Sequence, residues 1–275
     1  MLQSIEHQAG LPLAFDPMAA TLHWPEVVGV ERVSHRTFRE LSAYLAEPDA
    51  KPSRDPIYTV YRDVARREDA PRVEAAHLRY DITMIPAGVF AGQEKEYFRT
   101  AGHYHARLPG RPLAYPEVYE VIHGRAYWLI QRLAADDPAE LAEIYVIEAG
   151  PGEKAIMLPG FGHISINAFA EPLIMANWIC LDVSYDYGPY EKLRGGGYWL
   201  TEGDIASTVA FKQNGSYRSV PALVKLRPAE VPAFALRRST PLYALSHELD
   251  RLSFLSNPEA FPDLLTLDRC FQKVV

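Results

Sequence analysis

Short apolar runs separated by turn residues dominate the middle of the chain, from about residue 76 to residue 200. They are rich in β-branched and aromatic residues and recur about every ten residues, which is typical of strands in a sandwich or barrel. Gly124, between the second and third runs, predicts the turn of a β-hairpin. The predicted strands cover residues 78–85, 118–122, 126–131, 143–148, 155–158 and 172–179. We therefore expect a mainly β fold, for which a jelly-roll barrel of antiparallel strands is the natural candidate.

Weaker signals lie outside these strands. Apolar residues at helical spacing predict a helix over 37–45, and the charged run 62–72 suggests a solvated connector. A helical turn is expected at 138–141, and three glycines at 195–197 mark a junction. Two further short helices are predicted at 244–252 and 258–267. We expect a single domain, 1–275, made of an N-terminal extension (1–75), a barrel core (76–200) and a C-terminal extension packed on the barrel (201–275).

Composition narrows the classes of function. With 275 residues, 48% of them hydrophobic, the chain can bury a sizeable core. A formal net charge of −7 without a basic tract argues against a nucleic-acid partner. Two cysteines, Cys180 and Cys270, cannot form a disulfide framework and indicate a reducing compartment. Neither a signal peptide nor an apolar stretch of the roughly 20 residues that span a bilayer is visible, so we expect a cytoplasmic protein with no membrane partner.

The candidate chemistry lies in three histidines and one glutamate. His103 and His105 would point to the same face of a strand, because side chains two residues apart do so. Glu117 opens the next strand, and His163 follows a glycine-rich turn. Taken singly, these residues are better explained as surface or hydrogen-bonded histidines and a strand-end carboxylate. Together, three imidazoles and a carboxylate would bind one divalent ion (Fe, Mn, Ni, Co or Zn) and leave coordination positions open, as in catalytic sites.

Two groups of residues match the motifs of the cupin superfamily. The first comprises His103, His105, Glu117 and Gly124, and the second comprises Pro159, Gly160, His163 and Asn167. The stretches 100–105, 115–131, 151–167 and 186–188 further resemble the cupin-type glucose-6-phosphate isomerases. The resemblance extends over about residues 55–200. It implies a cupin jelly-roll β-barrel with flanking helices and a homodimeric enzyme that interconverts glucose 6-phosphate and fructose 6-phosphate.

The resemblance also implies roles for individual residues. His103, His105, Glu117 and His163 would hold one divalent metal ion per chain. The phosphate of the sugar phosphate substrate would lie near Thr83, Thr100 and Gly102, the sugar would lie near Tyr119 and Tyr187, and Tyr61 would line the pocket.

Catalysis is assigned to Glu117 and Tyr119. Glu117 is the candidate base, as the one carboxylate at the metal centre. A hydride shift between C1 and C2 stays open as the alternative to proton transfer. Tyr119 shares its strand face and can orient a hydroxyl or donate a proton, although a core tyrosine is an equally good reading. For Lys95 and Arg99 we weigh assistance to the phosphate against plain surface cations, and we expect His123 to be exposed.

Two other classes of function stay open at this level. The first is another metal cupin enzyme, such as a dioxygenase or a different sugar-phosphate isomerase. The second is a non-catalytic cupin that binds a sugar or a metal. A fold alone does not decide among them, because one scaffold hosts many chemistries.

Overall fold

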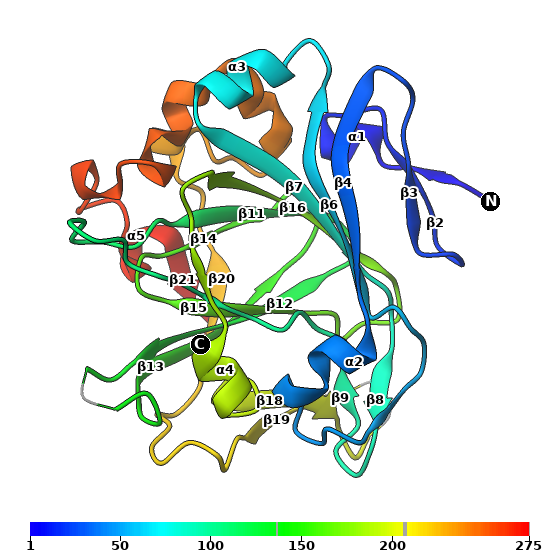
Figure 1. Cartoon of the computed structure of the whole chain (residues 1–275), viewed down its shortest axis with the longest axis vertical. Helices are drawn as coiled ribbons and strands as arrows, with labels where there is room; N and C mark the ends of the chain where they lie inside the picture. Colours follow the sequence, from blue (N-terminus) through cyan, green and yellow to red (C-terminus); the bar gives the residue numbers. More distant parts are fainter. Residues whose placement is uncertain (136, 206–207, 275) are drawn as a thin grey trace.

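The computed structural model of the chain describes residues 1–135, 137–205 and 208–274. Two mainly antiparallel sheets face one another across the middle of the molecule (Figure 1). The mainly β fold expected from the sequence is therefore confirmed, and its layout is of the cupin jelly-roll kind.

The larger sheet has six strands, paired antiparallel throughout. In spatial order they are β14 (Lys154–Met157), β11 (Glu117–His123), β16 (Leu173–Cys180), β7 (Leu78–Ile85), β6 (Tyr58–Arg66) and β4 (Val28–Arg36). The last two come from the segment expected to be an N-terminal extension. The sheet therefore begins upstream of the core expected at 76–200, and it includes a pair of strands that the sequence did not reveal.

The facing sheet has five strands, and its central hairpin joins β12 to β13. In spatial order they are β15 (Gly162–Ile166), β12 (Ala126–Leu133), β13 (Leu141–Ala149), β20 (Val224–Pro228) and β21 (Phe271–Lys273). Only the β13–β20 pair in this sheet is parallel. Because β20 and β21 lie beyond residue 200, the C-terminal region extends this sheet.

Three smaller sheets complete the β structure. They contain β19 (Val209–Gln213), β18 (Tyr198–Glu202), β9 (Glu96–Tyr97), β8 (Val89–Ala91) and β5 (Lys51–Pro52); β1 (Gln3–Ser4), β2 (Ala14–Asp16) and β3 (Thr21–His23); and β10 (Tyr104–His105) with β17 (Tyr185–Asp186). The α-helices are α1 (Glu6–Ala9), α2 (Phe38–Leu41), α3 (Ala70–Ala75), α4 (Gly188–Lys192) and α5 (Leu267–Cys270). Short 3-10 helices cover Ser42–Tyr44, Pro232–Phe234, Leu242–His247, Leu249–Leu255 and Pro258–Ala260.

The helical predictions were partly right. The segment 37–45 forms α2 and a 3-10 turn, and Thr37 begins it with a capping box to Glu40. The helix expected at 244–252 consists of 3-10 turns, whereas most of 258–267 after Ala260 is irregular up to the start of α5. A helical turn at 138–141 was wrong, since Leu141 already begins β13.

The solvated connector expected at 62–72 was also wrong. Its first half is the end of β6 and its second half leads into α3, so the segment is part of the main sheet. The charges did not prevent strand formation, because Arg62 is paired with Asp81 on the neighbouring strand β7. Val64 and Ala65 are both buried, and the other charged side chains of the run reach solvent except Asp69, which is 0% exposed.

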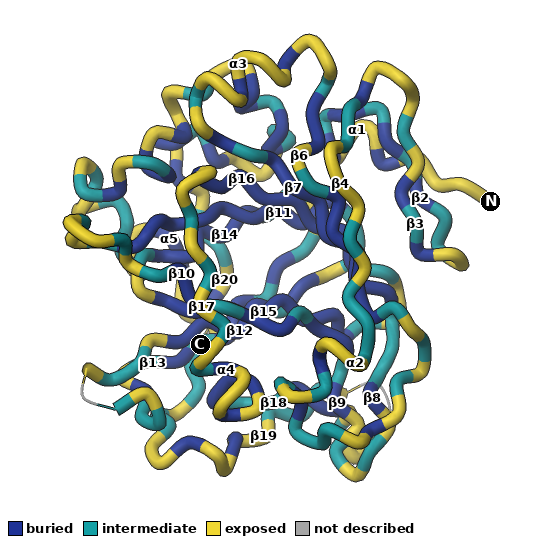
Figure 2. The backbone as a smooth tube through the Cα atoms, in the orientation of Figure 1, coloured by how far each residue is buried: buried dark blue, intermediate teal, exposed yellow. Residues whose placement is uncertain are grey.

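Both faces of the six-stranded sheet are covered, so its central strands are buried along their whole length (Figure 2). On the outer face, the rings of Tyr80, Trp178 and Tyr243 form an aromatic cluster with centroids 4.9–6.2 Å apart. Tyr243 belongs to the C-terminal region, whose 3-10 helices lie beside α3 in Figure 1. The inner face carries the candidate site.

Candidate metal centre

Three strands bring the four candidate ligands together. His103 and His163 lie opposite each other in an antiparallel bridge, with both N–H groups bonded to the other residue's carbonyl at 3.2 and 3.0 Å. His105 ends β10 two residues later, and Glu117 begins β11 on the opposite sheet. The expected i, i+2 arrangement of the first two histidines therefore holds, and strand pairing places His163 beside them.

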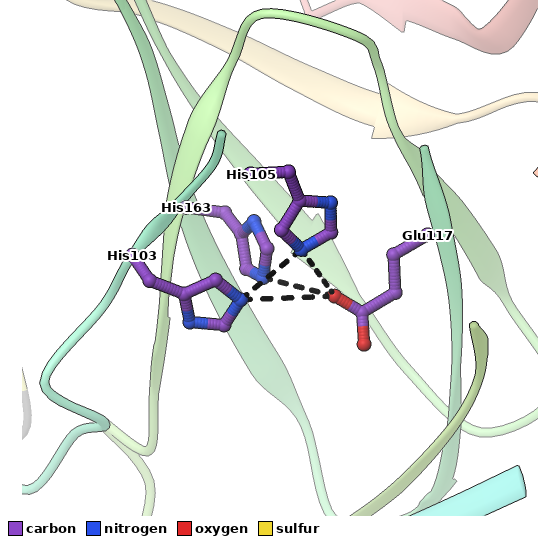
Figure 3. A group of neighbouring side chains, drawn as sticks. All are labelled: His103, His105, Glu117 and His163. Carbon is purple, nitrogen blue, oxygen red and sulfur yellow. Dashed lines mark hydrogen bonds and ion pairs between the residues drawn. The ribbon is translucent and has the colours of Figure 1, made fainter. Parts of the chain in front are cut away.

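The four side chains point at one another (Figure 3). The Nε2 atoms of His163 and His105 lie 3.3 and 3.4 Å from Oε2 of Glu117, and Nε2 of His103 lies 4.0 Å from it. The Nε2 atoms of His103 and His105 are 3.2 Å apart. One donor atom from each residue lies within 4.8 Å of the other three. Ligands bound at about 2.1 Å to one ion lie at such separations from each other.

The donor set fits a divalent metal ion. Within the described residues, Oε2 of Glu117 is buried and has no hydrogen-bond partner, although a buried carboxylate oxygen normally accepts a bond. Two imidazole nitrogens in contact have only one proton to share when both rings are neutral. An ion placed among these atoms would satisfy the carboxylate oxygen and all three nitrogens.

Electrostatics keep the ligands in the states that metal binding needs. Burial lowers the pKa of His103 far below its ordinary value, and the charges of His163 and His105 lower it further. Burial also lowers the pKa of His163, against the effect of Glu117. For Glu117, burial raises the pKa, but the close contacts of its Oε2 with the imidazoles of His105 and His163 outweigh this effect and hold the pKa below its usual range. Neutral imidazoles and an ionised carboxylate are the forms that bind metals.

Outer contacts orient the ligands. Nδ1 of His105 donates to the carbonyl of Tyr115 at 2.7 Å, which leaves its Nε2 free to bind. The ring of Tyr185 stands edge-on to that of His103, with centroids 4.6 Å apart. Gly162, next to His163, lies against the ring of Tyr104, where a Cβ would come within 2.6 Å. Glycine is needed at that position because the ring fills the space of a side chain.

A pocket opens beside the four ligands and contains most of the residues expected to bind substrate. Thr83, Thr100, Gly102, Tyr119 and Tyr187 all line it. Gly102 has a φ of +77°, and a Cβ there would meet Ile164 at 2.4 Å, so this glycine allows the chain to turn into the pocket. The expected residues of the substrate site therefore gather at one place.

Tyr61 was expected in the pocket wall and is not there. It lies on the opposite face of β6, where its hydroxyl accepts a hydrogen bond from the Leu22 N–H at 2.9 Å and its ring packs on Trp24. Strand alternation puts Tyr58 and Val60 in the wall instead. A tyrosine of β6 does line the pocket, but it is Tyr58 and not Tyr61, which lies on the other face of the strand.

Sequence reasoning assigned no role to five polar residues of the pocket: Arg36, Tyr58, Arg62, Asp81 and Tyr185. A usable signal existed for Asp81, which is an isolated carboxylate in the middle of an apolar strand. The others come from strands β4 and β6, which were not predicted, or from β17.

Of three basic residues outside the pocket, Lys95 is a surface cation as expected, whereas Arg99 and His123 are not exposed. Arg99 is 3% exposed and pairs with Glu96 at 2.5 Å, so it is neither a surface cation nor part of the pocket. Lys95 pairs with Glu202 near the surface at 3.2 Å. His123 was expected to be exposed, but it is half-buried against Phe15, with centroids 4.6 Å apart.

Comparison with known proteins points to one family. The family model described as glucose-6-phosphate isomerase matches residues 35–216. The glucose-6-phosphate isomerase of Thermococcus kodakarensis is 28% identical over 162 residues, which cover 57% of this chain and 74% of the relative. That of Thermococcus gammatolerans is 25% identical over 171 residues, covering 60% and 78%.

Among solved structures, oxalate oxidase superposes with a TM-score of 0.35 and 15% identity, over 51% of this chain and 59% of the other. Hazelnut vicilin superposes with a TM-score of 0.34 and 12% identity, over 50% and 34%. The family model alone spans well over half of the chain and includes all four candidate ligands. This chain belongs to the glucose-6-phosphate isomerase family.

Proposed function

We propose that this protein is a metal-dependent aldose–ketose isomerase that interconverts glucose 6-phosphate and fructose 6-phosphate. The observation that carries the proposal is the geometry of one pocket. Three of the candidate ligands, His103, Glu117 and His163, line it, and His105 lies directly beside them. The same pocket is lined by Thr83, Thr100 and Gly102, where the family resemblance puts the phosphate. The family membership and the names of the relatives support the same reaction.

The reaction moves a hydrogen between C1 and C2 of the sugar phosphate, and negative charge develops on the neighbouring oxygens. A divalent ion held by the four ligands supplies Lewis acidity for those oxygens. Glu117 is the carboxylate placed to move the proton, since its second oxygen is turned away from the imidazoles in Figure 3.

Tyr119 is placed to act as a proton donor. Its hydroxyl lies 3.4 Å from Nε2 of His163, on the inner face of β11 beside Glu117. Burial raises the pKa of Tyr119 well above its ordinary value, and the charge of Glu117 raises it further. The phenol therefore keeps its proton at neutral pH and can donate it to a sugar oxygen.

The phosphate would be held at the other end of the pocket. Thr100 Oγ1 accepts a hydrogen bond from the Ser165 N–H at 3.0 Å, so its own hydroxyl proton is available for a phosphate oxygen. Arg36 lines the same pocket and adds a positive charge. The guanidinium is suited to this role because it presents paired N–H donors to phosphate oxygens.

We further propose one divalent ion per chain, a single domain over residues 1–275, a homodimer and a cytoplasmic setting. The domain proposal is supported by the C-terminal strands that extend the second sheet. Among the helices in the described parts of the chain, none is long and apolar enough to cross a membrane.

A coupled assay of fructose 6-phosphate conversion tests the proposal. Activity should disappear with EDTA and return with one of Mn²⁺, Fe²⁺, Ni²⁺, Co²⁺ or Zn²⁺. His163→Ala should lose both the metal and the activity, because it removes one ligand and one of the imidazoles that contact Glu117. His123→Ala is the matched control, since its ring lies outside the site against Phe15. Full activity of His163→Ala, or no conversion with any metal, would contradict the proposal.

A further inference from the structure

Three charged side chains lie on the inner face of the six-stranded sheet, next to the candidate metal centre. They are Arg62 on β6 and Arg79 and Asp81 on β7. The Asp81 side chain is 3% exposed and both arginine side chains are 19% exposed. Burying charged side chains inside a barrel carries a desolvation cost, so packing alone does not explain why they are there. A cluster of this kind is therefore a candidate for a role in binding.

Asp81 is fully engaged by its neighbours. Its oxygens accept hydrogen bonds from Arg62 Nη1 at 3.0 Å, from Arg79 Nε at 2.9 and 3.0 Å, and from the Asp63 N–H at 2.9 Å. Two guanidinium groups thus share one carboxylate, which leaves the cluster with one positive charge in excess. The Asp63 carboxylate lies within electrostatic reach of Arg79 and offsets part of that charge.

Of the two arginines, Arg62 is the one that faces the pocket. It lines the pocket together with Asp81, His103, Glu117 and Tyr119. Its Nη1 is used by Asp81, whereas its Nε is buried and has no hydrogen-bond partner among the described residues. The charge of Arg62 also contributes to lowering the pKa of His103, which places it within electrostatic reach of that ligand.

Arg79, by contrast, contacts a tyrosine that packs against one of the candidate metal ligands. Its Nη2 donates to the Tyr185 hydroxyl at 3.1 Å, and the ring of Tyr185 stands edge-on to His103. Asp81 therefore orients two arginines that have different roles. Arg79 supports Tyr185 beside His103, and Arg62 faces the pocket.

The two ends of the pocket both carry a cation. Arg36 is paired in register with Tyr58, four residues before Arg62 on β6, and Tyr58 and Arg62 share a strand face. Four residues of extended strand span about 13 Å. This separation suits a six-carbon phosphorylated sugar whose phosphate lies at Arg36 and whose carbonyl end lies at the metal.

We infer that Arg62, oriented by Asp81, is a further substrate-contacting residue that donates to the C1–C2 oxygens and stabilises the negative charge developing there. The inference rests on the proposed function and deepens it. A fixed guanidinium in a partly dry pocket favours the transition state over the neutral sugar, because charge is present only in the former. The ligand class favoured by such a pocket is a phosphorylated sugar acid with a planar carboxylate at C1.

Arg62→Gln tests this, because glutamine keeps a hydrogen-bond donor for Asp81 and removes the charge. We expect kcat to fall by about 100-fold or more, as for loss of one oxyanion donor, with a much smaller change in KM. Affinity for a five-carbon aldonate 5-phosphate, measured by calorimetry on the metal-loaded protein, should fall similarly. Affinity for glucitol 6-phosphate, which has no charge at C1, should be retained. Arg62→Lys should recover part of the loss in both kcat and aldonate affinity.

Arg32→Gln is the matched control. Arg32 lies opposite Arg62 in register on β4, is exposed, and is not among the pocket residues, so the same change of charge should leave kcat and both affinities unaltered. Metal content and thermal unfolding of Arg62→Gln show whether the site is intact.

The outcomes separate the two levels of the argument. If the wild-type protein isomerises the sugar phosphate and Arg62→Gln retains kcat and aldonate affinity, the inference is overturned and the proposed function stands. Equal losses for the aldonate and for glucitol 6-phosphate would also overturn it, since they indicate a collapsed pocket. A wild-type protein without isomerase activity overturns the proposed function and the inference with it.

Discussion

Glu120 and Lys154 form an ion pair on the outer face of the sheet that carries the site, and breaking it should destabilise the protein strongly. The side chains are 1% and 4% exposed, and Lys154 Nζ lies 2.6 Å from Oε1 of Glu120. The second carboxylate oxygen accepts the Leu242 N–H at 2.7 Å. Lys154 also donates to the carbonyls of Gly152 and Arg237, both at 2.9 Å. The pair thus ties the C-terminal region to β11 and β14.

Removing one partner leaves the other charge buried and alone, which costs about 3–5 kcal/mol. Lys154→Met and Glu120→Gln should each lower the free energy of unfolding by this amount at pH 8. The double variant should recover most of the loss, because replacing both partners removes the uncompensated charge. Urea unfolding followed by tryptophan fluorescence measures this well, since the Trp178 indole donates to the Leu242 carbonyl at 3.0 Å.

The cost of Lys154→Met should also depend on pH. Burial raises the pKa of Glu120 to about 7 even though Lys154 lowers it, so without the ammonium the pKa in the folded protein is higher still. A pKa raised above its unfolded value gives stability that is present at low pH and is lost as pH rises through the folded pKa. Above pH 7 the variant should therefore keep losing stability relative to wild type, by up to about 1.4 kcal/mol per pH unit.

Lys95→Met is the matched control, because the Lys95–Glu202 pair is exposed and should contribute less than about 1 kcal/mol. An unfolding free energy of Lys154→Met within about 1 kcal/mol of wild type at pH 8 would refute the reasoning. So would a cost that shrinks between pH 7 and pH 9.

Three further predictions concern the pocket. Tyr119→Phe removes the hydroxyl that lies 3.4 Å from His163 Nε2, so kcat should fall about 100-fold with unchanged metal content; loss of metal would mean that Tyr119 supports the ligands instead. Gly162→Ala puts a Cβ 2.6 Å from the Tyr104 ring and should cost about 1–3 kcal/mol of stability and weaken metal binding, which thermal unfolding and a metal titration measure. Arg36→Gln should raise KM roughly tenfold with little change in kcat, as expected for a half-exposed phosphate contact; an unchanged KM would move the phosphate elsewhere.

Local pattern was enough to predict the strands around the site and the grouping of its ligands. Side chains two residues apart on a strand lie on the same face. His103 and His105 were therefore expected to point the same way, whichever strands pair with theirs. The hairpin expected at Gly124 was wrong, because β11 pairs with β14 and β16 while β12 pairs with β13 and β15 in the facing sheet. The turn itself was predicted correctly: φ of Gly124 is +75° and a side chain there would meet the Pro172 carbonyl. These features depend on residues close together in the chain, and the sequence alone determined them.

Pairing between strands that are far apart in the sequence determined the features that were predicted wrongly. Tyr61 was placed in the pocket and lies behind it, because a shift of one residue in a strand exchanges its two faces. The charged run 62–72 became a strand and a helix because Asp81, 19 residues after Arg62, supplies a buried partner for it. No local pattern reveals that partner.

The sequence by itself therefore determined that this protein is mainly β and that three histidines and a glutamate can gather at one point. Only the tertiary structure decided which other side chains surround that point: Arg36 and Arg62 at two ends of the pocket, with Asp81 between the arginines of β6 and β7. The physical reason is that strand alternation is a property of each residue's own backbone, whereas register and sheet order depend on which distant strands bury their surfaces together.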